Sequence, residues 1–251
     1  MYRSVLITGA ARRIGRHMAR DMAADGWAVV VHFNRSADDA RSLLGEISAA
    51  GGRAAGVQAD LSAAEAPGRL VASARNFFGP LTCLINNASL FEPDEAGNVT
   101  AASFAAHLDT NLRAPVFLSQ SFAAQLPQEE PGNIVNIIDQ RVWKLTPRFF
   151  SYTVSKAALW TVTQTLAQAF APRIRVNAIG PGPALPNVRM DENEFAKQSR
   201  LTLLQRGTSP EEISQALRFI LASPAMTGQM IVLDGGQHLV WQTPDVMAVS
   251  E

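Results

Sequence analysis

Two side chains of opposite acid–base character lie one helical turn apart in the segment "FFSYTVSKAAL". Tyr152 and Lys156 are four residues apart, so a helix presents them on one face. A phenol with a pKa of about 10 is a poor acid at neutral pH, but a neighbouring ammonium favours the phenolate and should bring this pKa toward the working range. The pair predicts proton transfer to a substrate, with an exposed pair on a helix surface as the alternative.

A second group of residues is typical of binding the phosphates of a dinucleotide. The segment "VLITGAARRIGR" puts Gly9 directly after a predicted strand and Gly15 at the start of a helix, where backbone amides can approach a pyrophosphate. The alternative is a plain strand-to-helix turn. After the second strand, where an acid would select NAD, the chain has Asn34, Arg35 and Ser36. A guanidinium suits a 2′-phosphate, which predicts NADPH, unless Arg35 is only a solvated loop residue.

Further candidates follow the third and fourth predicted strands. Asp60 could accept a hydrogen bond from the adenine amino group, and Leu61 could pack on the ring. Asn86, Asn87 and Ala88 come at the end of the fourth strand. Asparagines are also common in turns, but open α/β sheets bind ligands at this edge.

Strand-like and helix-like runs alternate along the chain and would position these residues. The predicted strands are Ser4–Thr8, Ala28–Phe33, Ala54–Gln58, Cys83–Asn86, Ile134–Ile138, Arg175–Ile179 and Met230–Leu233, each apolar enough for burial on both faces. The predicted helices are Ile14–Ala24, Ala37–Ala50, Ala64–Phe78, Phe104–Leu126, Thr153–Ala171 and Pro210–Leu221. This alternation predicts a parallel sheet covered on both faces in a single domain. Residues 181–205 are expected to be irregular, either as a lid or as a surface excursion.

Composition excludes several classes of protein. Lys plus Arg and Asp plus Glu both total 22, so no net charge favours nucleic acid or an anionic membrane, and a small molecule is the expected partner. The single cysteine, Cys83, permits no intramolecular disulfide, and a cytoplasmic protein is expected. No apolar run approaches the roughly 18 residues of a membrane helix. The histidines lack acidic or cysteine neighbours at ligand spacing, so no metal is expected; they are His17, His32, His107 and His238.

Taken in chain order, the motifs resemble those of the short-chain dehydrogenases/reductases. They are "TGAARRIG", "NNAS", Asn111 in "NLRAP", "YTVSK", "RVNAIGPG" and "TGQMIVLDGG", and they span nearly the whole chain. The resemblance implies one NADP-binding Rossmann-type domain over residues 1–251, with a doubly wound parallel sheet of seven strands in three α/β/α layers, and a homotetramer. It also implies pro-S hydride delivery, Tyr152 as the acid, Lys156 on the nicotinamide ribose and Asn111 in a proton relay.

Asp139 departs from the family pattern, in which most members have a serine that donates to the substrate carbonyl. Ketone reduction builds negative charge on oxygen, and an ionised carboxylate would repel that charge. Reduction of a ring imine differs, because the adjacent nitrogen must gain a proton that a carboxyl group linked to Tyr152 can help to supply. Burial would raise the pKa of Asp139 and Lys156 would lower it, so its protonation state stays open.

The same aspartate and other details resemble the pteridine reductase branch, and the tail "LDGGQHLV" resembles its bacterial dihydromonapterin reductases, also described as alternative dihydrofolate reductases. The resemblance implies that Arg13 and Ser89 approach the cofactor phosphates and the pterin. It implies that Phe91 stacks the pterin against the nicotinamide, with an ordinary core or lid residue as the alternative. The segment "GPGPALPN" lacks the usual Thr or Ser that grips the nicotinamide carboxamide, and backbone groups near Leu185 are the expected substitute.

These expectations define three sets of residues. The catalytic set is Asp139, Tyr152, Lys156 and Asn111, and the substrate-binding set is Arg13, Ser89, Phe91, Asp139 and Tyr152. The cofactor-binding set is Gly9, Arg13, Ile14, Gly15, Asn34, Arg35, Ser36, Asp60, Leu61, Asn87, Ala88, Ser89, Tyr152, Lys156, Pro181 and Gly182. Together they predict NADPH-dependent reduction of a dihydropterin (dihydromonapterin, dihydrobiopterin or dihydrofolate) to its tetrahydro form.

Two other functions would use some of the same residues. A carbonyl reductase acting, for example, on 3-oxoacyl thioesters would use Tyr152 and Lys156 but would gain nothing from Asp139. Basic residues in and just beyond the irregular segment could serve an acyl-carrier partner; they are Arg189, Lys197, Arg200 and Arg206. An NADP-binding sensor is the other rival, although a binding protein has no need of a proton donor. His238 is a candidate for reaching a neighbouring subunit's site.

Overall fold

Seven parallel strands form a single sheet in the computed structural model of the chain, which describes residues 3–186, 189 and 191–243. The strand order is β3-β2-β1-β4-β5-β6-β7, as expected for a doubly wound sheet. The strands are β1 (Ser4–Ile7), β2 (Ala28–Phe33), β3 (Arg53–Gln58), β4 (Cys83–Asn86), β5 (Gly132–Ile137), β6 (Ile174–Pro181) and β7 (Met230–Leu233). Because all neighbours pair in parallel, the carboxyl ends of all strands lie at one edge of the sheet. The predicted fold is confirmed.

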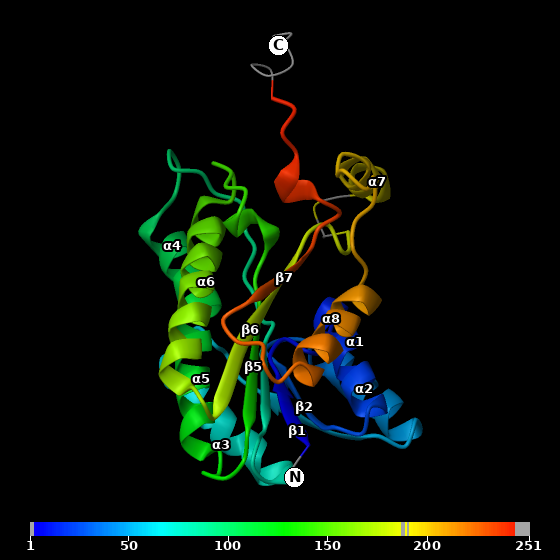
Figure 1. Ribbon diagram of the computed structural model, residues 1–251, viewed down its shortest axis with the longest axis vertical. Coiled ribbons are helices and arrows are strands. Elements are labelled where there is room, and N and C mark those ends of the chain that lie inside the picture. Colours follow the sequence, from blue (N-terminus) through cyan, green and yellow to red (C-terminus); the bar gives the residue numbers. More distant parts are fainter. Residues whose placement is uncertain (1–2, 187–188, 190, 244–251) are drawn as a thin grey trace.

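Helices cover both faces of the sheet and produce three layers (Figure 1). One face carries α1 (Arg13–Ala24), α2 (Ala37–Ala49) and α8 (Pro210–Ala222). The other carries α3 (Ala66–Phe78), α4 (Ala101–Leu108), α5 (Ala114–Gln125) and α6 (Phe150–Phe170). No helix in the described part of the chain is both long and apolar enough to cross a membrane.

Successive residues of the central strands point into opposite layers of the core. Val5 and Ile7 of β1 belong to the cluster packed against α1, α2 and α8, whereas Leu6 belongs to the cluster packed against α3, α5 and α6. All three side chains are completely buried. The expectation that every strand is buried on both faces is wrong for β3 and β7, which are only partly buried because each lies at an edge of the sheet.

Two predicted segments differ in the structure. The run predicted as one helix over 104–126 is divided into α4, a π-helical turn at Asp109–Arg113 and α5, with Pro115 in the first turn of α5. The segment 181–205 is not irregular throughout, because it contains α7 (Glu192–Arg200). Asp191 caps that helix by accepting a hydrogen bond from the Glu194 amide at 2.7 Å. Residues 187, 188 and 190 of the predicted loop lie outside the described residues.

Candidate active site

A cleft of about 860 Å³ opens at the carboxyl edge of the sheet, where the strand order reverses between β1 and β4. Residues that follow different strands meet in its wall. The predicted residues in this wall are Gly9, Arg13, Ile14, Gly15, Asn34, Asp60, Leu61, Asn87, Ala88, Ser89, Phe91, Asp139, Tyr152, Lys156, Pro181 and Gly182. Asn111, Arg35 and Ser36 lie outside it. The fold therefore brings most of the expected site together.

The predicted acid and the aspartate are in direct contact. The Tyr152 hydroxyl donates a hydrogen bond to Asp139 Oδ2 at 2.8 Å. The other oxygen, Oδ1, accepts from the Arg141 amide at 2.8 Å, which fixes the carboxyl group at the end of β5. Lys156 lies on the same face of α6 as Tyr152, and its Nζ donates to the Ile137 carbonyl at 2.8 Å. The carboxyl group is thus turned into the cleft beside the phenol.

Burial dominates the acid–base properties of this group. It raises the pKa of Asp139, against the opposing charge and amide of Arg141, the hydrogen bond of Tyr152 and the charge of Lys156. Burial and then the nearby Asp139 charge raise the pKa of Tyr152 well above its ordinary value. The prediction that the pKa of the Tyr152 phenol is lowered is therefore wrong. Burial lowers the pKa of Lys156 to about 8. Tyr152 keeps its proton at neutral pH and can act as a donor.

The glycine turn packs against the end of β4 and is held by a histidine. A Cβ on Gly9 would lie 3.0 Å from Ala88 Cα, and a Cβ on Gly15 would lie 2.4 Å from the Gly9 carbonyl oxygen. The Gly9 amide donates to His32 Nδ1 at 3.1 Å, and His32 Nε2 lies 3.1 Å from the Ala59 carbonyl. The neutral ring with its proton on Nε2 satisfies both bonds. From the sequence, His32 was weighed only as a metal ligand, and this role was not predicted.

The predicted ribose end of the cleft is only partly lined by the expected residues. Asn34 lies in the wall, and the charge of Arg35 helps to lower the pKa of Asp60, after the larger effect of its hydrogen bonds from Ser62. Arg12, which was not among the predicted site residues, lines the cleft and forms an ion pair with Asp39 at 2.5 Å. The only sequence signal for Arg12 was the double arginine in the turn.

Arg13 lines the cleft, and its side chain bonds to the segment that follows β6. Its guanidinium donates to the carbonyls of Pro186 at 2.6 Å and Leu185 at 3.2 Å. The Leu185 carbonyl, expected near the nicotinamide carboxamide, thus has a partner within the protein. Arg13 also has a φ of 55°, in the left-handed region that is uncommon for residues other than glycine.

Aromatic rings line the end of the cleft beside Tyr152. Phe91 stacks on Phe149 with ring centroids 4.3 Å apart and planes at 11°, and it meets Tyr152 edge-to-face at 4.6 Å. Arg141 and Arg189 flank the Phe91–Phe149 pair, and each guanidinium carbon is almost equally far from both centroids. Phe91 was predicted here from the sequence. Phe149 was not, because its contact depends on a fold that joins distant segments.

Asn111 contacts the site indirectly, through hydrogen bonds to the backbone of Leu90. Its side chain is completely buried in the π-helical turn, accepts from the Leu90 amide at 2.7 Å and donates to the Leu90 carbonyl at 2.9 Å. It also donates to Ser155 Oγ at 3.0 Å. These bonds hold the segment that carries Ser89 and Phe91. Ser89 itself is exposed in the wall of the cleft.

His238 bonds within its own chain. Its Nδ1 lies 2.7 Å from the buried carboxylate of Asp234, and its ring meets that of Trp143 edge-to-face at 5.3 Å. The neighbouring Gln237, not His238, lines the cleft. Contact of His238 with a neighbouring subunit stays a prediction. No group of three potential metal ligands occurs among the described residues.

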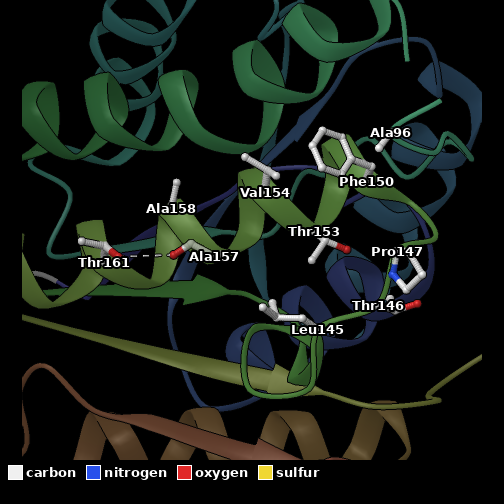
Figure 2. A pocket seen from close by; sticks show the side chains of 10 residues that line it. All are labelled: Ala96, Leu145, Thr146, Pro147, Phe150, Thr153, Val154, Ala157, Ala158 and Thr161. Carbon is white, nitrogen blue, oxygen red and sulfur yellow. Dashed lines mark hydrogen bonds between the residues drawn. The ribbon is translucent and has the colours of Figure 1, made fainter. Parts of the chain in front are cut away.

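A second hollow of about 760 Å³ lies along the outer side of α6 (Figure 2). Phe150, Val154, Ala157 and Ala158 of the helix line it, together with Leu145 of the preceding loop. The residues of its wall carry no ionisable side chain. It therefore has no group for acid–base chemistry, in contrast to the cleft at the strand ends.

Comparisons with known proteins agree with this architecture. The chain matches the family model "short chain dehydrogenase" over residues 3–197. The crystal structures of FolM alternative dihydrofolate reductase 1 from Brucella suis, in complex with NADP, and from Brucella canis, complexed with NADP, are each 48% identical to the chain with a TM-score of 0.94. These matches cover 96% and 97% of this chain, and 97% and 96% of the other. The 3-oxoacyl-[acyl-carrier-protein] reductase of Synechocystis sp. is 30% identical, covering 92% of this chain and 95% of its own.

Proposed function

Because this chain belongs to the short-chain dehydrogenase family, we propose that it uses NADPH to reduce a dihydropterin to the tetrahydro form. The resemblance to the branch of alternative dihydrofolate reductases is confirmed by the two FolM structures. The substrate assignment depends on one observation, the contact of 2.8 Å between the Tyr152 hydroxyl and the Asp139 carboxyl group. Dihydromonapterin, dihydrobiopterin and dihydrofolate all have the ring C=N bond that this pair would protonate.

The cleft has a suitable set of groups for the dinucleotide. The N-terminus of α1 has neither a side-chain cap nor an acidic residue in its first turn, so its amides and positive dipole end can meet phosphate oxygens. Gly9, Gly15 and Ala88 would lie along the pyrophosphate, and Asn34 with Arg35 near the 2′-phosphate. Lys156 would hold the nicotinamide ribose. NADPH, when bound, supplies the hydride for the ring carbon.

The protein's own groups would supply the proton. As hydride reaches the ring carbon, the adjacent nitrogen takes the Tyr152 proton. A protonated Asp139 can then pass its proton to the phenolate through their hydrogen bond, and burial of Asp139 favours that protonated form. Lys156, with a pKa of about 8, is largely an ammonium at neutral pH and stabilises the transient phenolate. A carboxyl group beside the donor thus suits a nitrogen acceptor.

A carbonyl reductase remains the second candidate because the Synechocystis relative acts on an oxoacyl carrier protein by name. Two of the four basic residues considered for an acyl-carrier partner are already paired with acids. Arg189 contacts Glu92 at 2.8 Å and Arg206 contacts Glu212 at 2.5 Å. An NADP-binding sensor would bind the cofactor without turnover of any of these substrates.

The test follows NADPH oxidation with dihydromonapterin, dihydrobiopterin, dihydrofolate and an acetoacetyl thioester. We expect turnover of the dihydropterins, and a loss of about 100-fold or more in kcat/KM for the Asp139→Ser variant, since general acid catalysis contributes factors of this size. Asp38→Ser, which changes an aspartate with a side chain 92% exposed, is the matched control. Turnover of the thioester alone, or full dihydropterin activity in Asp139→Ser, would overturn the proposal.

We also propose that the chain forms a homotetramer in the cytoplasm. The apolar hollow along α6 supports self-association, since large exposed apolar patches usually mark interaction surfaces (Figure 2). The exposed Phe117 on the adjacent α5 adds to the apolar surface on this side of the sheet. The single cysteine, buried Cys83, supports a reducing compartment.

A further inference from the structure

Two buried polar atoms in the wall of the cleft have no partner within the protein. They are Oε1 of Gln140 and Nη1 of Arg141, the two residues that follow Asp139. Of the described residues with such unpartnered atoms, only these two line the cleft. Buried donors and acceptors are nearly always satisfied, because leaving them unpaired costs free energy. An adjacent acceptor and donor of this kind indicate a ligand that pairs with both.

The Arg141 guanidinium lies against aromatic rings and forms no ion pair with another described residue. It lies beside the Phe91–Phe149 pair, 5.2 Å and 5.0 Å from the two ring centroids. Within the described ranges, no carboxylate lies within 4.0 Å of it. Arg189 on the same ring pair differs, since it bonds to Glu92 and to the Phe91 carbonyl. Arg141 thus presents a charged donor next to the proton-donating group.

We propose that Gln140 and Arg141 recognise the cyclic amide edge of the substrate, an inference that rests on the proposed dihydropterin reduction. Along one edge, a dihydropterin carries the ring nitrogen that gains the proton, then a carbonyl oxygen, then an amide N–H. The Asp139–Tyr152 pair donates to the nitrogen, Arg141 donates to the carbonyl oxygen, and Gln140 accepts from the N–H. These three consecutive residues at the end of β5 provide the complementary groups. A 3-oxoacyl thioester has no such N–H at its reacting group.

The test compares two ligands on the NADP-loaded protein by titration calorimetry. Pterin has the carbonyl and amide N–H, whereas 2,4-diaminopteridine has an amino group and a bare ring nitrogen in their places. We expect Gln140→Leu and Arg141→Met each to weaken pterin binding about 10- to 100-fold, as expected for losing a buried hydrogen bond, the Arg141 bond being charge-assisted. Binding of the diamino compound should change less than about threefold in Arg141→Met, because it has no carbonyl oxygen for this guanidinium. In Gln140→Leu it should change less than pterin binding, because its bare nitrogen cannot donate to Gln140 Oε1.

Control variants distinguish the loss of a ligand contact from a change in charge and from misfolding. Gln140→Leu changes no charge, and Gln140→Glu keeps the acceptor and should retain more pterin affinity than Gln140→Leu. Arg141→Lys keeps the charge that acts on Asp139 but loses the planar donor, so it should fall between the wild type and Arg141→Met. Arg148→Met alters an exposed arginine on the same connection between β5 and α6 and should change neither affinity. Unchanged NADP affinity checks that each variant is folded.

Two results would overturn the inference. An equal loss of affinity for both ligands would mean that these residues only shape the cleft, and no loss would mean that they do not touch the substrate. Failure of the proposed function would look different from failure of this inference, because the wild-type protein would then oxidise no NADPH with any dihydropterin. Turnover of dihydropterins without altered ligand selectivity in the variants would reject only the role of Gln140 and Arg141.

Discussion

His32 links the acid–base state of one side chain to the shape of the cofactor turn. Its ring is 2% exposed and joins the Gly9 amide to the Ala59 carbonyl. Burial lowers its pKa to about 4. A protonated ring cannot accept the Gly9 hydrogen bond at Nδ1, so the observed turn requires the neutral form. The segment "VVVHF" shows that His32 lies on a strand, but its two partners come from the segments that follow the first and third strands and depend on the register of the sheet.

We therefore predict an acid-sensitive contribution to stability. An unfolded histidine has a pKa of about 6.5, so between pH 6.5 and about 4 the unfolded state binds a proton that the folded state excludes. Stability should fall as pH drops through this window, by about 3 kcal/mol in total. Urea unfolding at a series of pH values would measure this loss. The His32→Gln variant should lack it, and an identical pH dependence in the variant would contradict the prediction.

Among the elements, the start of α6 combines a strained backbone with an aromatic contact. Phe149 precedes the helix with a φ of 56°, a left-handed conformation that is costly for a bulky residue. Its ring stacks on one face of Phe91, and Phe91 in turn meets Tyr152 edge-to-face. The strained residue therefore buttresses the proposed stacking platform.

Replacing Phe149 by Asn should test this arrangement, because Asn tolerates the left-handed conformation but removes the ring. Loss of an aromatic pair worth about 0.5–1.5 kcal/mol should raise the KM for a dihydropterin by up to about tenfold, with kcat largely retained. Steady-state kinetics at saturating NADPH would measure the change, with Phe77→Asn, an exposed ring on α3, as the control. A lower KM in Phe149→Asn would mean that Phe149 covers the face that the substrate uses.

For the whole molecule, the sequence was informative where function depends on local spacing. The Tyr152–Lys156 spacing, the Gly9–Gly15 turn and the position of Asp139 at the end of a strand all place residues in the cleft. Contacts between segments far apart in the sequence, such as the stacking of Phe149 on Phe91, could not be predicted from local spacing. The pKa of Tyr152 was predicted in the wrong direction, because the spacing reveals a nearby ammonium but not the extent of burial.

The proposed homotetramer can be tested at the apolar hollow along α6 (Figure 2). A glutamate at Val154 would place a charge inside the proposed contact and should produce a species smaller than the tetramer. Light scattering after size exclusion would measure the mass. Gln168→Glu introduces the same charge on α6 outside the hollow and should leave the mass unchanged. A monomeric wild-type protein would contradict the proposed homotetramer.

The hydrogen bonds that Arg13 donates to the carbonyls of Leu185 and Pro186 bear on the order in which cofactor and substrate bind. An N–H group that bonds to these carbonyls is not available to a phosphate, so an incoming dinucleotide that attracts this guanidinium must compete with the segment over the cleft. Arrival of the dinucleotide and release of the segment are then thermodynamically linked. A substrate would then enter more readily once the dinucleotide has released the segment, which predicts a preferred order of binding with the nucleotide first.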